Sequence, residues 1–269
     1  TDYNQGFVLP TAIDQRIEFE LGRNGTKDTC HIYSRTYEAF ASFDLNQVVP
    51  QQASWANYLL GVIDEIQKLG KKFEGFACII RSSLPIGAGI SSSAALECGF
   101  ASGINDLFGL GLEKIEIVRL SQAAENNFVG SNCGIMDQYA SVMSKKGHLI
   151  LLDCRSLEAE YIPADFKDCK VLLLNTKVEH NLAEGQYNKR RKECEDAVKT
   201  IQERYPQVKA LRDVNVEMLK EFKEPLSSQT FSRAAYVIQE NLRVQQAAEA
   251  IKSGDLRNFG HLMYQSHHG

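Results

Sequence analysis

The sequence lacks any long hydrophobic run. No stretch of its 269 residues approaches the roughly 20 apolar residues that a membrane-spanning helix needs. The first residues do not resemble a signal peptide. An excess of positive charge is missing as well, because the formal net charge is -4, whereas a surface that binds nucleic-acid phosphates needs a basic face. We therefore expect no membrane partner and no nucleic-acid partner.

The sequence also lacks paired cysteines. Its seven cysteines occur singly, with no Cys-x-x-Cys pair. A disulfide framework usually shows an even set of cysteines, and a zinc site usually shows close pairs. An odd and scattered set is typical of reduced core cysteines, so we expect a cytoplasmic protein.

The hydrophobic pattern predicts an α+β protein of two domains. Hydrophobic residues make up 43% and charged residues 24%, as in ordinary globular proteins. Periodicity predicts strands over residues 7–13, 16–21, 30–40, 76–80, 148–152 and 171–174. It predicts helices over residues 53–69, 92–108, 113–127, 187–205, 231–251 and 256–261. The shift to a mostly helical pattern places a domain boundary near residue 165.

The most informative segment runs from Pro85 to Ala95 and reads Pro-Ile-Gly-Ala-Gly-Ile-Ser-Ser-Ser-Ala-Ala. Gly87 and Gly89 let the backbone turn and approach a ligand closely. Three serines at the expected start of a helix exceed what capping requires, since one serine suffices for a cap. A helix N-terminus attracts phosphate groups, so the segment favours polyphosphate binding over a plain capped turn.

This segment resembles the second motif of the GHMP kinases, a class that includes galactokinase, homoserine kinase and mevalonate kinase. In that class the loop wraps the phosphates of ATP, and a serine and a glutamate from the next helix hold Mg²⁺. The resemblance places Mg²⁺ on Ser93 and Glu125. It assigns ATP contacts to Pro85, Gly87, Ala88, Gly89, Ile90, Ser91, Ser92, Ser93 and Ala94.

Two further segments resemble the galactokinase branch of the class. Residues 1–13 are similar to the downstream part of the galactokinase signature, which implies that Asp2 binds galactose hydroxyls. The segment Cys133-Gly134-Ile135-Met136-Asp137-Gln138 is similar to the one that carries the catalytic aspartate. The resemblance therefore implies that Asp137 is catalytic and that Gly134 contacts the sugar.

Two aromatic residues complete the site that the resemblance implies. Tyr187 falls on a tyrosine that contacts the sugar in galactokinases. Trp55 falls on a tryptophan near the adenine, although it also lies on the apolar stripe of an expected helix and could instead belong to the core. One residue departs from the family pattern, because Glu179 stands where many galactokinases carry a basic residue.

The resemblance covers nearly the whole chain. It implies an N-terminal ATP-binding domain with sugar-site segments at residues 1–165. Residues 166–269 would begin a C-terminal domain that is incomplete relative to the family, with the active site in the cleft between domains. The parts of the family pattern that precede Thr1 and follow Gly269 are not in the sequence.

The function that follows is transfer of the γ-phosphate of ATP to the C1 hydroxyl of galactose by a monomeric enzyme. One alternative is a kinase of a related sugar, such as N-acetylgalactosamine or arabinose. A second is a galactose- and ATP-binding regulator without catalysis. Regulators of this type lose residues of the serine-alanine stretch, and Ser93-Ala94 is present here. A third is an interaction module, which leaves the serine-rich loop unexplained.

Overall fold

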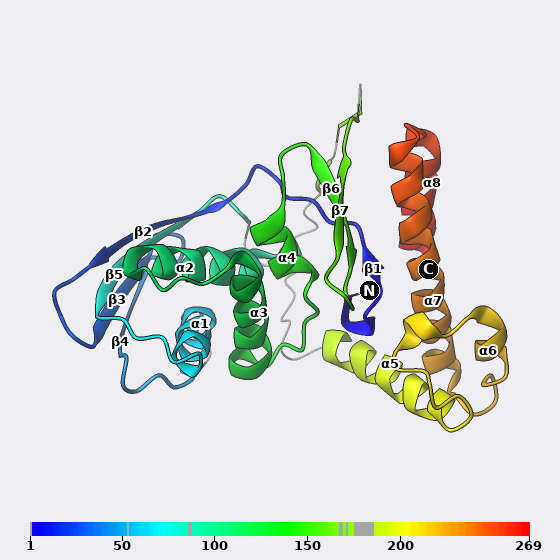
Figure 1. The fold of residues 1–269 in the computed structure, drawn as a ribbon, viewed down its shortest axis with the longest axis horizontal. Helices are drawn as coiled ribbons and strands as arrows, with labels where there is room; N and C mark the ends of the chain where they lie inside the picture. The colour runs from blue at the N-terminus through cyan, green and yellow to red at the C-terminus, as the bar shows by residue number, and fades with distance from the viewer. Residues whose placement is uncertain (1, 53, 86–87, 167–168, 171, 175–185) are drawn as a thin grey trace. The chain divides into compact units, whose positions relative to one another are not determined.

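A computed structural model describes residues 2–52, 54–85, 88–166, 169–170, 172–174 and 186–269. It contains both helices and strands, as the α+β prediction requires (Figure 1). The chain forms two compact units. Unit 1 comprises Thr1–Ala12, Ser144–Leu173 and Glu184–Gly269, and unit 2 comprises Ile13–Met143 and Leu174–Ala183. This grouping does not follow a single boundary near residue 165, and that boundary remains a prediction.

Unit 2 is built on a four-stranded sheet with the order β2-β5-β3-β4. Its strands are β2 (Ile17–Arg23), β3 (Thr29–Ser34), β4 (Ala39–Asp44) and β5 (Phe76–Ser82). Strand β5 pairs antiparallel with β2 and parallel with β3, and β3 forms an antiparallel pair with β4. The single strand predicted over residues 30–40 is therefore wrong, because a turn between Ser34 and Ala39 separates two strands.

Helices pack against this sheet and form its core. They are α1 (Asn57–Lys68), α2 (Ser92–Phe108), α3 (Lys114–Ala124), the π-helical turn η2 (Glu125–Val129) and α4 (Met136–Met143). Alternate residues of β5, beginning with Phe76, are buried beneath the helices. The ring of Phe76 lies 5.7 Å from that of Phe100 on α2, so aromatic packing fixes this helix on the sheet.

Two glycines allow α2 to approach β2 closely. A Cβ atom on Gly99 would lie 2.4 Å from Phe19 Cε2, and one on Gly103 would lie 2.3 Å from Leu21 Cδ1. The two glycines are four residues apart and therefore face the same strand. This close packing places the first turn of α2 at the end of the sheet, directly after the serine-rich loop.

Unit 1 combines a small sheet with helices. The antiparallel sheet has the order β1-β6-β7. Its strands are β1 (Phe7–Val8), β6 (His148–Asp153) and β7 (Ala159–Pro163), and its helices are η1 (Asp2–Asn4), α5 (Gln186–Gln202), η3 (Leu211–Asp213), α6 (Val216–Lys220), α7 (Ser228–Lys252) and α8 (Leu256–His268). None of the helices in the described ranges is long and apolar enough to cross a membrane.

Two strand predictions in unit 1 need correction. The strand expected over residues 7–13 has only two residues, because Pro10 has no N–H with which to extend the ladder. Residues 172–174 are not a strand, and residue 171 lies outside the described residues. Leu172 and Leu174 are 76% and 79% exposed, so this apolar run is not part of the described sheet.

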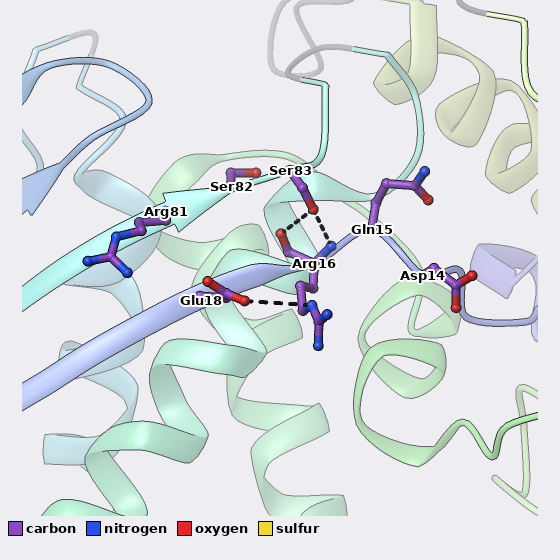
Figure 2. Close-up of a pocket in the computed structure, with 7 residues that line it drawn as sticks. All are labelled: Asp14, Gln15, Arg16, Glu18, Arg81, Ser82 and Ser83. Atoms are coloured by element: carbon purple, nitrogen blue, oxygen red, sulfur yellow. Dashed lines mark hydrogen bonds and ion pairs between the residues drawn. The ribbon is translucent and has the colours of Figure 1, made fainter.

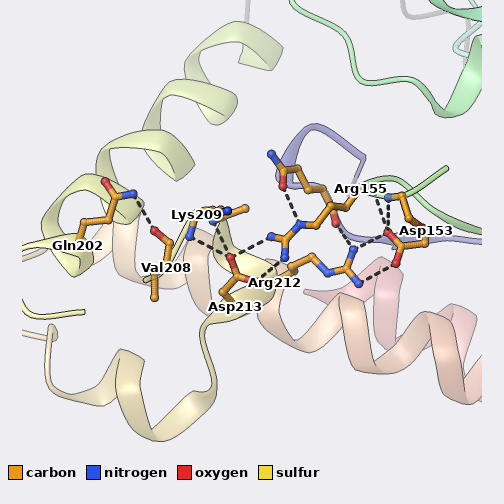
Figure 3. Close-up of polar contacts among 10 residues, drawn as sticks. Asp153, Arg155, Gln202, Val208, Lys209, Arg212 and Asp213 are labelled. Atoms are coloured by element: carbon orange, nitrogen blue, oxygen red, sulfur yellow. Dashed lines mark hydrogen bonds and ion pairs between the residues drawn. The ribbon is translucent and has the colours of Figure 1, made fainter. Parts of the chain in front are cut away.

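Two crossed ion pairs join the end of β6 to η3 (Figure 3). The Arg155 guanidinium donates to both Asp213 oxygens at 2.8 and 2.9 Å. The Arg212 guanidinium donates to both Asp153 oxygens at 2.5 and 2.9 Å. These hydrogen bonds lower the pKa of each carboxyl group from 3.8 to about 2. Both pairs are bidentate, the geometry in which an arginine–carboxylate pair is strongest.

We expect these pairs to make the protein sensitive to acid. The pKa of each carboxyl group is lower in the folded than in the unfolded protein, so the ionised carboxylates stabilise the fold above pH 3.8. This stabilisation is lost as the pH falls through about 2 and the carboxylates become protonated. Asp153→Asn should lower the free energy of unfolding at pH 7 by on the order of 1–2 kcal/mol. Its stability should also depend less on pH between 4 and 2 than that of the wild type.

Urea unfolding followed by circular dichroism at several pH values measures both effects. Glu217→Gln is the matched control, because the Glu217 side chain is 78% exposed and bonds only an exposed lysine in the described structure. A pH dependence of Asp153→Asn identical to that of the wild type would show that the Asp153 pair does not act in this way.

Candidate functional site

The serine-rich loop leads into the first turn of α2, as predicted. Ala88 to Ser93 are partly accessible apart from the exposed Gly89, Pro85 is exposed and Ala94 is buried, whereas residues 86 and 87, and with them Gly87, lie outside the described residues. Gly89 has φ +71°, the left-handed conformation that favours glycine. The loop therefore presents backbone and hydroxyl groups at a helix N-terminus, where an anion is stabilised.

Ser91 shows that capping does not account for the serines. It precedes α2 with φ 60° and ψ 39°, and within the described structure its side chain makes no capping hydrogen bond. A non-glycine residue in this conformation costs on the order of 1–3 kcal/mol, and such strain concentrates at binding and catalytic sites. The strained Ser91 supports the ligand-binding interpretation of the loop.

Ser93 and Glu125, the two residues predicted to hold Mg²⁺, lie together. Glu125 begins η2 and is only 3% exposed. Burial raises its pKa, and a hydrogen bond from the Ser93 hydroxyl acts in the opposite direction. The charge of Asp137 is among the groups that raise the pKa of Glu125, so α4 brings that aspartate near the same carboxylate.

This donor set fits Mg²⁺. A hydroxyl and a carboxylate are hard oxygen ligands, and Mg²⁺ usually takes only one or two such ligands from the protein in addition to phosphates and water. Among the described residues there is no cluster of three or more metal-binding side chains, so a cage made of protein alone is not found there. The Glu125 charge is among the causes that raise the pKa of Glu97, and the Asp137 charge is among those that raise the pKa of Glu125, so a divalent cation beside Glu125 would offset repulsion between these carboxylates.

Glu97 and Gln138 belong to the same cluster and were missed by the sequence analysis. Both are fully buried. Burial raises the pKa of Glu97 well above its usual value, and the neighbouring Glu125 charge raises it further. Gln138 Nε2 donates to Glu125 Oε2 at 2.8 Å. An acidic residue four positions after Ser93, on the inner face of a helix, was the signal that could have revealed Glu97.

Asp137 and Gly134 lie at the start of α4. Asp137 is in the first turn of the helix and is partly accessible, while Gly134 is buried just before it. A carboxylate in this position is stabilised by the helix dipole.

Asp2 and Tyr187, the predicted sugar contacts of unit 1, lie on either side of Tyr3. The Tyr3 amide donates to Asp2 Oδ1 at 2.9 Å, and the Tyr3 ring meets the Tyr187 ring edge-on at 5.3 Å. Burial, followed by nearby charges, raises the pKa of Tyr3 to about 12. Arg212 Nη1 also donates to the carbonyl of Gln5 at 2.8 Å, so the crossed ion pairs anchor the turn that carries Asp2.

Trp55 was predicted to lie on a helix, but it does not. It precedes α1, which begins at Asn57, and it is partly buried. Its ring stacks on that of Tyr37, from the β3–β4 turn, with centroids 5.9 Å apart and planes 18° apart. Stacked and partly accessible rings are compatible with the expected role beside adenine. Glu179 lies outside the described residues.

A separate hollow of about 440 Å³ opens beside β2 and β5 (Figure 2). None of the predicted site residues lines it. The Ser83 hydroxyl accepts from the Arg16 amide at 2.8 Å and donates to the Arg16 carbonyl at 3.0 Å. These bonds tie the end of β5 to the chain entering β2 and so support the strand that leads into the serine-rich loop.

Comparisons with known proteins show which family the chain resembles. Residues 57–145 match the family model described as the GHMP kinases N terminal domain. The chain is 40% identical to a galactokinase from Thermosipho africanus over 99% of the chain and 72% of the relative. It is also 40% identical to a galactokinase from Haemophilus influenzae, over 99% of the chain and 69% of the relative.

Solved structures show the same similarity. A galactokinase from Lactococcus lactis, solved in complex with galactose, superposes with a TM-score of 0.94 at 31% identity, over 99% of this chain and 69% of that one. The mevalonate kinase of Methanococcus jannaschii shares the fold, with a TM-score of 0.53 at 15% identity over 87% of this chain and 75% of that one.

Proposed function

The chain belongs to the galactokinase family of the GHMP kinases, and from this premise we propose that it transfers the γ-phosphate of ATP to the C1 hydroxyl of galactose. The observation that carries the proposal is the grouping of Ser93, Glu125 and Asp137 around the start of α2. This grouping combines an anion-binding helix terminus, a pair of Mg²⁺ ligands and a carboxylate that can accept a proton.

In the proposed reaction the galactose C1 oxygen attacks the γ-phosphorus. The bond from that phosphorus to the bridging oxygen breaks, and ADP leaves. Asp137 orients the C1 hydroxyl and accepts its proton late in a loose transition state. A bound Mg²⁺ would neutralise charge on the β- and γ-phosphate oxygens.

The loop and the first turn of α2 hold the phosphates in this proposal. Ser91 to Ser93 supply backbone N–H groups and hydroxyls, and Gly89 permits close approach of the backbone. Trp55 lies beside the adenine. Asp2, Gly134 and Tyr187 position the sugar. The Asp2 carboxylate selects a substrate with hydroxyls in the matching arrangement, because it can accept hydrogen bonds from two neighbouring hydroxyls.

The domain division near residue 165, the monomeric state and the cytoplasmic location belong to the same proposal. A catalytic protein is favoured over a non-catalytic regulator, because the serine-alanine stretch that such regulators lose is present as Ser93-Ala94. The strained backbone of Ser91 also supports a functional, ligand-binding loop.

A panel of acceptors tests the proposal. ADP release from Mg·ATP should depend on galactose, and the kcat/KM value should be highest for galactose among galactose, N-acetylgalactosamine, arabinose, mevalonate and homoserine. A preference for mevalonate or homoserine would refute the sugar assignment. A preference for another sugar would correct the substrate and leave the class of reaction intact.

A further inference from the structure

Gln138 is a buried amide that contacts the predicted Mg²⁺ ligand Glu125 directly. Its Nε2 atom lies 2.8 Å from Glu125 Oε2, and the residue has no exposed surface. The amide nitrogen must face the carboxylate, because the amide oxygen would repel it. In a buried setting a hydrogen bond to a charged acceptor fixes the orientation of that acceptor more firmly than a neutral one would.

The position of Gln138 is fixed from several sides. Its backbone carbonyl accepts a weak hydrogen bond from the Cys98 thiol of α2, with sulfur and oxygen 3.8 Å apart. Its Nε2 atom also lies 3.6 Å from Cys133 Sγ. Gln138 therefore joins three segments of unit 2: α2, the residues before α4, and η2. It directly follows Asp137 in the chain, so one turn of α4 carries both residues.

We propose that Gln138 is a positioning residue, which orients the Glu125 carboxylate for Mg²⁺ and ties that carboxylate to the helix that carries Asp137. The inference rests on the proposed function, because it assigns Glu125 to the metal. A hydrogen bond from Gln138 to Glu125 Oε2 limits rotation of the carboxylate, which also hydrogen-bonds the Ser93 hydroxyl, the Cys133 thiol and Glu97. Loss of such a supporting bond typically costs 10- to 100-fold in metal affinity.

Nucleotide binding separates this role from a purely structural one. We would measure the affinity for ADP by calorimetry, with and without Mg²⁺, in the absence of sugar. The ratio of the two affinities reports how well the protein holds Mg²⁺ beside the nucleotide. A change that only loosens the fold would lower both affinities together and leave the ratio unchanged.

Gln138→Met keeps the length of the side chain and removes the donor. We expect it to lower the ratio about 10-fold or more, with a smaller effect on ADP affinity without Mg²⁺. Gln138→Asn is a second variant, which keeps the amide but withdraws it from Glu125, and should act in the same direction. Gln122→Met is the matched control, because the Gln122 amide donates to the carbonyl of Cys133 at 3.3 Å and should leave the ratio unchanged.

The outcomes distinguish this inference from the proposed function. If the wild type binds ADP more tightly with Mg²⁺ and both Gln138 variants keep that ratio within twofold, the role of Gln138 is refuted while the proposed function stands. If the wild type phosphorylates galactose but gains no ADP affinity from Mg²⁺, the assignment of Glu125 to the metal is wrong, and the inference fails with it.

Discussion

Replacement of Asp137 by asparagine is expected to lower kcat at least about 100-fold, the low end of the effect of losing a positioned base. Asparagine has nearly the same shape and can still hydrogen-bond the C1 hydroxyl, but it cannot accept its proton and carries no charge. Galactose affinity should change far less than kcat, because the lost interaction matters mainly in the transition state. The fold should survive, since the substitution is isosteric.

The measurement needs kcat, galactose affinity and the thermal midpoint on one preparation of the variant. Asp106→Asn, an exposed position on α2, is the matched control and should leave all three unchanged. If Asp137 served only as a turn or capping residue, stability would fall by about 1 kcal/mol while turnover stayed within a few-fold. That pattern would remove Asp137 from the mechanism.

Ser93→Ala and Glu125→Gln should each raise the Mg²⁺ concentration that gives half-maximal activity, by about 10-fold or more. Each variant removes one hard oxygen ligand, or its charge, from a site that takes few ligands from the protein. Galactose binding should change little, because the change falls at the start of α2 and at η2. Glu125→Gln also removes the negative charge that contributes to the raised pKa of Glu97.

Activity measured against Mg²⁺ concentration reports the Mg²⁺ requirement. A separate binding experiment reports the affinity for galactose. Ser102→Ala is the control for the serine, because the Ser102 hydroxyl donates to the Cys98 carbonyl at 2.8 Å further along the same helix. An unchanged Mg²⁺ requirement in both variants would show that neither residue holds the cation.

Local patterns were the part of the fold that the sequence predicted best. The helix predicted over residues 92–108 matches α2 (Ser92–Phe108), and Gly109 directly after it has φ 61°, the left-handed conformation that commonly ends a helix. The alternation that begins at Phe76 also corresponds to a strand. These features depend on residues close together in the chain, and periodicity detects them without knowledge of the tertiary structure.

Trp55 shows where local reasoning failed. Its spacing fits the apolar stripe of α1, but the helix begins two residues later, at Asn57, and the ring stacks on Tyr37. Periodicity determines the ends of helices poorly. An apolar residue just outside a helix can pack against the same core as the residues within it, and so it continues the apolar pattern. Tyr37 comes from a turn elsewhere in the chain, and no pattern near Trp55 indicates it.

The polar cluster around Glu125 was only half predictable. Ser93 and Glu125 were paired through the resemblance to GHMP kinases, and the structure brings them into contact. Glu97 and Gln138 join them only because α2, η2 and α4 converge in the folded unit. A buried polar side chain and its partner can be far apart in sequence, so contacts of this kind become visible only in three dimensions.

The most direct measurement of the central claim is the position of phosphate in the product. The protein would be incubated with Mg·ATP and galactose, and the product examined by phosphorus and proton nuclear magnetic resonance. The account predicts one new phosphate signal coupled to the anomeric proton, formed together with an equal amount of ADP. Phosphate on another hydroxyl of galactose, or no galactose phosphate at all while ATP and Mg²⁺ are present, would contradict it.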